Sequence, residues 1–211
     1  MHFGYKDKKN AKNAKYDGSI YHSQFPTTIY APLLKKLVLY GNIYSLNNKI
    51  IVPKTVKFLQ FDIPCLIGRH LNTQIIFPPN LETLLFGKYY PMKPRYIHNC
   101  IPQFQYSSFN IPNSVKRLLF YTFDSCNLKW YPDSLETLEI VTLPKECILP
   151  KTLKKLKLMT CDKTLTNIPN SVEQLIICSH SKHQIDFYKL NKLRKLVIPH
   201  NLINHISNVH N

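Results

Sequence analysis

Residues 112–120 read PNSVKRLLF, and residues 132–140 repeat the same frame as PDSLETLEI. With the proline counted as place zero, places three, six and eight are apolar in both segments, and places four and five are polar. Because successive side chains of a strand point to opposite faces, apolar residues at places six and eight predict a short strand with one buried face.

Eight copies of this frame follow one another along the chain. They begin at residues 31, 53, 78, 112, 132, 150, 169 and 190, so successive copies are 22, 25, 34, 20, 18, 19 and 21 residues apart. Place six is leucine in every copy: Leu37, Leu59, Leu84, Leu118, Leu138, Leu156, Leu175 and Leu196. Leucine frames at a period of roughly 20 to 29 residues are typical of leucine-rich repeats. The sequence therefore predicts an α/β or mainly β solenoid, with a curved parallel sheet of about eight short strands and irregular convex turns.

Place four carries charges whose sign alternates from one copy to the next. The residues are Glu82, Lys116, Glu136, Lys154, Glu173 and Arg194. If the strands stack in register about 4.8 Å apart, each inner charge lies between two opposite ones. The alternation thus predicts the register of the sheet.

Where the chain leaves the strand, Asn42, Cys161 and Asn201 occupy the place at which leucine-rich repeats bond the turn backbone.

Two segments carry a resemblance to a known family: residues 109–118 read FNIPNSVKRL, and residues 167–172 read NIPNSV. They resemble the units of the FNIP repeat family, which are similar to leucine-rich repeats, and the resemblance covers roughly residues 31–200. Family members occur in social amoebae and in giant viruses of amoebae, often behind an F-box typical of ubiquitin-ligase adaptors. Residues 6–15 lack the apolar helices of an F-box, so the chain resembles a repeat-only member. The resemblance implies an interaction module, with substrate recognition for a ubiquitin ligase as one such role.

The frame also divides the chain into segments. Residues 1–19 contain five lysines and few aliphatic residues, which predicts a flexible basic tail. Residues 20–30 are expected to form an N-terminal cap, and residues 31–211 the solenoid. The longest spacing between copies predicts an irregular insertion near 88–108.

Composition narrows the classes of function. The 211 residues carry 28 Lys+Arg and 12 Asp+Glu, a formal net charge of +16, and the five glycines form no phosphate-binding fingerprint. The six cysteines form no CxxC pair and are expected to be reduced thiols. The segment CSHSKH at residues 178–183 is better explained as a strand exit than as a metal site. Glu82, Glu136, Glu139 and Glu173 are expected on solvated strand faces. We expect no catalytic residues, no metal and no cofactor, hence a protein that is not an enzyme.

Places five, seven and nine point away from the core, on the side expected to be concave. Place seven is aliphatic in five of eight copies, and exposed apolar surface on a solenoid indicates a partner. The candidate binding residues are Lys36, Val38, Tyr40, Leu85, Arg117, Leu119, Tyr121, Lys155, Lys157, Ile176, Lys195 and Val197. In the alternative interpretation, neighbouring side chains cover these aliphatic residues.

The same outward residues indicate the class of partner. We expect a host or cellular protein bound through the concave face, with no contact to a membrane and a cytoplasmic location. The alternative is a nucleic acid, in the cytoplasm or nucleus, bound through the basic solenoid surface and the lysine-rich N-terminal tail.

Overall fold

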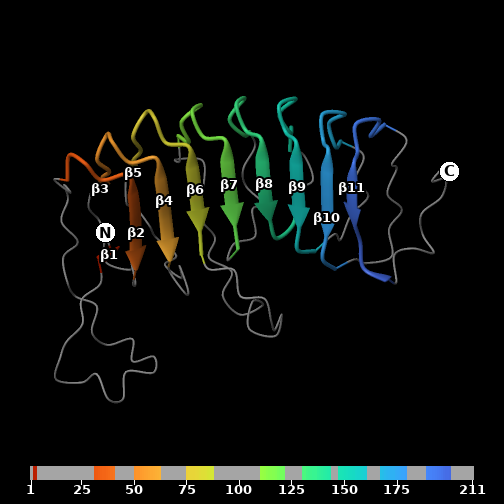
Figure 1. The fold of residues 1–211 in the computed structure, drawn as a ribbon, viewed down its shortest axis with the longest axis horizontal. Helices are drawn as coiled ribbons and strands as arrows, with labels where there is room; N and C mark the ends of the chain where they lie inside the picture. Colours follow the sequence, from red (N-terminus) through yellow and green to blue (C-terminus); the bar gives the residue numbers. More distant parts are fainter. Residues whose placement is uncertain are drawn as a thin grey trace, which may run out of the picture.

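The strands of all eight repeat units lie side by side in one parallel sheet (Figure 1). The computed structural model describes residues 2–3, 31–40, 50–62, 75–87, 110–121, 130–143, 147–160, 167–179 and 189–200. Apart from a 3-10 turn at His200, every regular element within these ranges is a β-strand. The predicted parallel solenoid, mainly β in character, is therefore confirmed.

Each repeat unit contributes one strand to the main sheet. The strands are β2 (Lys36–Tyr40), β4 (Phe58–Asp62), β6 (Thr83–Phe86), β7 (Arg117–Phe120), β8 (Thr137–Ile140), β9 (Lys155–Leu158), β10 (Gln174–Ile177) and β11 (Lys195–Val197). A ninth strand, β1 (His2–Phe3), pairs in parallel with β2 at the sheet edge. These two residues belong to the segment 1–19 predicted to be a tail. The cap at 20–30, the insertion near 88–108, and Asn42, Cys161 and Asn201 lie outside the described residues.

A tight turn precedes every repeat strand. In all eight units the N–H at place three donates to the carbonyl at place zero, over 3.0 to 3.2 Å. Proline occupies place zero in six units. Because proline has no N–H, it ends the pairing of the preceding extended segment and leaves its carbonyl to close the turn.

Places three, six and eight fill one continuous core. In the six units that begin at residues 53 to 169, none of these side chains is more than 3% exposed. Phe61, Phe86 and Phe120 follow one another at place eight, with ring centroids 5.2 and 4.9 Å apart. The core also includes the residue before place zero, as in Val52 and Ile111. A single unit cannot bury these faces alone, so stacking of units supplies the stability.

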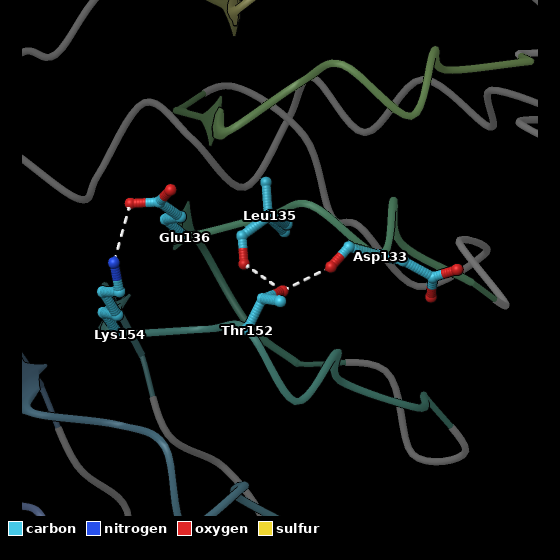
Figure 2. Close-up of polar contacts among 5 residues, drawn as sticks. All are labelled: Asp133, Leu135, Glu136, Thr152 and Lys154. Atoms are coloured by element: carbon cyan, nitrogen blue, oxygen red, sulfur yellow. Dashed lines mark hydrogen bonds and ion pairs between the residues drawn. The ribbon is translucent and has the colours of Figure 1, made fainter.

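Place two links each turn to the preceding one through a side-chain hydroxyl. Thr55, Ser114, Ser134 and Thr152 each donate to the place-three carbonyl of the preceding unit, over 2.8 to 3.1 Å. Figure 2 shows the Thr152 hydroxyl between the carbonyls of Leu135 and Asp133. These bonds satisfy carbonyls that the strand ladder does not reach. This explains the Ser or Thr in the repeat.

The charges at place four stand in register, as their alternation predicts. From Lys57 to Arg194, each place-four N–H donates to the place-four carbonyl of the preceding unit, over 2.8 or 2.9 Å. Two pairs of neighbouring place-four side chains form ion pairs. Lys57 and Glu82 are 2.6 Å apart, and Lys154 and Glu136 are 3.2 Å apart, the second pair being drawn in Figure 2. The prediction of register is confirmed.

A second, shorter row of parallel pairing lies on the segments that enter the turns. β3 (Ile50–Ile51) pairs with β5 (Ile75–Ile76), and Trp130 bridges Ile148 in the same sense. All of these residues lie two or three positions before place zero. The described segments that enter these turns are thus paired regularly, which the repeat frame does not predict.

Candidate functional site

The candidate site is the outward surface of the main sheet, formed by places five and seven of the repeat strands, which we call the strand face. Its side chains alternate with the buried ones at places six and eight, so they point to the opposite side of the sheet. Five of its residues are cationic: Lys36, Arg117, Lys155, Lys157 and Lys195. Glu139 is the one acidic residue in these two rows. The strand face is therefore basic around a single central carboxylate.

Glu139, on β8, joins side chains from the two units that flank its own. One carboxylate oxygen accepts from Lys155 Nζ at 2.7 Å, and the other accepts from the Tyr121 hydroxyl at 2.7 Å. Lys157 Nζ is 3.5 Å from that second oxygen. Register places Glu139 beside Lys157, while Lys155 reaches it diagonally from β9. The four residues form a group that we call the Glu139 cluster.

Burial and hydrogen bonding shift the pKa of Glu139 in opposite directions. Glu139 is only 5% exposed, and such burial by itself raises a carboxyl pKa. Hydrogen bonds from Lys155 and Tyr121, with the charges of Lys155 and Lys157, outweigh burial and hold the pKa of Glu139 below its ordinary value of 4.5. Glu139 is thus ionised at neutral pH, and the cluster carries a net charge of +1.

The other predicted site residues are distributed along the whole sheet. Lys36 lies on β2 with its ammonium 4.8 Å from the Phe58 ring centroid, and Tyr40 ends β2. Arg117 and Lys195 are exposed, Leu85 and Ile176 are half-buried, and Val197 is 43% exposed. The fold brings together Tyr121, Lys155 and Lys157, but it places β2 and β11 near opposite ends of the sheet.

Two of the predicted surface aliphatics are not accessible. Val38 is 2% exposed and Leu119 is 4% exposed. Leu119 lies between Leu85 and Glu139 in the place-seven row, where side chains on adjacent strands are close enough to shield it. The expectation that these two residues form exposed apolar surface is wrong. Leu85, Ile176 and Val197 retain accessible surface.

The expected position of Glu139 on a solvated strand face is also wrong. Its spacing within the repeat is that of an outward residue, and the structure confirms this direction but buries it under its neighbours. Two residues in the sequence could have indicated this burial: Lys157, at the same place in the next unit, and Tyr121, two residues after Leu119. Both reach one carboxylate only once the register is known.

The cysteines and histidines form no metal site among the residues that the structure describes. Cys147 and Cys178 are free, and burial raises the pKa of the Cys147 thiol. The described ranges contain no group of three or more potential metal ligands. His180 and His183, from the segment considered above as a metal site, lie outside these ranges.

Comparison with family models, with curated proteins and with solved structures finds no match to this chain. In the part of the chain that is described, no helix is long and apolar enough to cross a bilayer. The geometry of the strand face is therefore the main indication of function.

Proposed function

We propose that this protein is a non-catalytic interaction module that binds a protein partner through its strand face. The observation that carries the proposal is the mixture on this surface of exposed cations with accessible aliphatics. Arg117 and Lys195 supply charge, while Ile176 and Val197 lie opposite each other on adjacent strands. Arginine side chains beside apolar surface are common anchors at protein interfaces, and Arg117 is the exposed arginine of the strand face.

The rigidity of the strand face supports the same proposal. Its residues project from strands fixed by an in-register ladder, and the Glu139 cluster fixes two of its lysines. A surface that is ordered before binding loses less conformational entropy when the partner arrives. A solenoid provides this order over many strands.

The most buried ionisable group of the strand face is unsuited to proton transfer. Both oxygens of Glu139 accept hydrogen bonds, and its pKa is lowered rather than raised toward neutrality. A general base requires a pKa near the working pH and access to the substrate. Glu139 instead orients its lysine neighbours, which favours binding over catalysis.

Affinity capture with matched variants tests the proposal. The tagged protein, its Ile176→Glu/Val197→Glu variant and a Leu33→Glu/Ile148→Glu control are each incubated with nuclease-treated lysate, and bound proteins are quantified by mass spectrometry. Leu33 and Ile148 are 87% and 77% exposed and lie outside the strand face, so the control adds the same two negative charges elsewhere on the molecule. We expect one set of proteins to bind the wild type and the control but not the Ile176→Glu/Val197→Glu variant. Equal capture by all three would contradict the proposal.

The alternative partner, a nucleic acid, is favoured by the net charge of +16. A parallel capture without nuclease distinguishes the two. Proteins that are recovered only without nuclease would indicate binding through nucleic acid. Recovery of ligase scaffold subunits with the nuclease-resistant partner would place the module in a ubiquitin ligase, as the repeat resemblance implies.

A further inference from the structure

The place-five row carries a regular charge pattern over its last five strands. Neighbouring residues are paired in register from β7 to β11, in the order Arg117, Thr137, Lys155, Gln174 and Lys195. A cation therefore stands on every second strand, separated by a neutral polar residue. Adjacent strands are about 4.8 Å apart, so successive cations are spaced by about 9.6 Å across the sheet.

The three cations of this row are available in different ways. Arg117 and Lys195 are exposed, and within the described residues neither has an ion-pair partner. Lys155 is held by Glu139 at 2.7 Å, with its side chain 31% exposed. An ammonium has three donors, so Lys155 retains bonding capacity at a fixed position. The row thus presents three cationic positions over a span of about 19 Å.

We propose that this row binds an acidic segment of the partner in polyproline II conformation, with a carboxylate at every third residue. The inference rests on the proposed function and names the chemistry of the ligand. Polyproline II has three residues per turn and rises about 3.1 Å per residue, so every third side chain points the same way at about 9.3 Å intervals. This interval matches the spacing of Arg117, Lys155 and Lys195 and places three carboxylates over three cations.

Other backbone conformations fit the row less well. In an extended strand, side chains on one face recur at about 6.8 Å, which cannot follow cations about 9.6 Å apart. A helix with acids seven residues apart advances about 10.5 Å per repeat and overshoots by about 2 Å over two steps. The polyproline II segment also brings its apolar residues to Ile176 and Val197 in the adjacent row.

The same spacing disfavours a nucleic acid on this row. In each strand of a duplex, one phosphate recurs about every 3.4 Å of helix axis, far more densely than these cations. Glu139 lies among them with both oxygens already bonded, and its charge repels a continuous phosphate chain. Carboxylates spaced three residues apart lie over the cations and leave no negative charge opposite Glu139. The row therefore favours an acidic peptide.

Two labelled peptides of identical composition test the spacing. One contains four Glu-Pro-Pro repeats, and the other contains four glutamates followed by eight prolines. Binding is measured by fluorescence anisotropy at low ionic strength. We expect the wild type to bind the spaced peptide about five-fold more tightly than the block peptide, because only the spaced one aligns with the row.

Matched charge removal locates the site. The Arg117→Gln/Lys195→Gln variant should bind the spaced peptide about ten-fold more weakly, as expected for two lost ion pairs. The Lys54→Gln/Lys151→Gln control loses the same charge at two exposed turn positions and should bind like the wild type. Equal losses in both variants would overturn the assignment to this row.

The remaining outcomes separate this inference from the proposed function. Equal affinity for the two peptides, or tighter binding of an oligothymidylate of equal length, overturns the inference. If neither peptide binds while protein capture still depends on Ile176 and Val197, the inference fails and the interaction module stands. If neither peptide binds and capture is insensitive to those residues, both fail.

Discussion

The inward and outward sides of the repeat strands differ sharply in the side chains that they carry. The inward side has leucine at place six in every unit, and seven of these eight side chains are 0% exposed. The outward side varies from unit to unit, with lysine, threonine, glutamine, arginine and aliphatic residues at places five and seven. Uniform apolar residues on one side make the core continuous, so the opposite side is free to carry a binding surface.

Glu139 is the exception that clarifies this difference. It lies on the outward side but is as inaccessible as many core residues, at 5% exposure. It is tolerated because Tyr121, Lys155 and Lys157 surround it with donors and positive charge. Direction within a strand and accessibility are therefore separate properties.

The largest effect is expected for the inward leucines of the central units. Leu138→Ala removes a 0% exposed side chain and should lower the free energy of unfolding by about 3 kcal/mol. Leu196→Ala in the last unit should cost clearly less, because Leu196 is only partly buried. Chemical denaturation followed by circular dichroism measures both. Equal losses would mean that the terminal unit is packed as firmly as the center.

The Glu139 cluster should give the next largest effect. Glu139→Gln leaves Lys155 and Lys157 without their shared counter-charge and should cost about 1 to 3 kcal/mol of unfolding free energy. Thr137→Ala, on the outward side of the same strand, should change it by less than about 0.5 kcal/mol. Similar values for the two variants would show that the cluster is dispensable.

Acid should weaken the same cluster. Because the pKa of folded Glu139 lies below its ordinary value of 4.5, its stabilising contribution is complete above that pH and is lost as the pH falls toward the folded pKa. Unfolding measured between pH 6 and about pH 3 should show a steeper loss for the wild type than for Glu139→Gln. Parallel curves would contradict the ionised, hydrogen-bonded state of Glu139.

A smaller effect is expected for the hydroxyls at place two. Ser134→Ala removes bonds to the carbonyls of Val115 and Asn113 and should cost about 1 kcal/mol. Ser171 occupies the same place, but its buried hydroxyl has no hydrogen-bond partner among the residues that the structure describes, so Ser171→Ala should be close to neutral. Thermal unfolding compares this matched pair. A larger loss for Ser171→Ala would reverse the assignment.

The smallest effect is expected for the ion pairs at place four. Lys154 and Glu136 are 57% and 40% exposed, so Glu136→Gln should change the unfolding free energy by less than about 0.5 kcal/mol. Because salt screens exposed charges, the difference should vanish in about 1 M sodium chloride. A difference that persists at high salt would mean that the place-four ladder does more than support the register.

The repeat frame was sufficient to predict the eight repeat strands, their parallel order and their register. Repeated identities at places three, six and eight determine which side of each strand faces the core, and the place-four charges indicate which residues lie opposite. Accessibility on the outward side was less predictable, as Val38, Leu119 and Glu139 show. It depends on the size and reach of side chains from other units, such as Tyr121, and the frame treats units as equivalent. The second row formed by β3 and β5 was missed because its residues lie before place zero, outside the frame.

The central claim is that the inward side determines the fold and the outward side determines binding. It is tested most directly by one variant, Arg117→Gln/Ile176→Thr/Lys195→Gln, in which thermal unfolding and partner capture are measured on the same preparation. We predict a melting temperature within about 3 °C of the wild type and loss of the nuclease-resistant partner. A folded variant that still captures this partner at the wild-type level would contradict the claim.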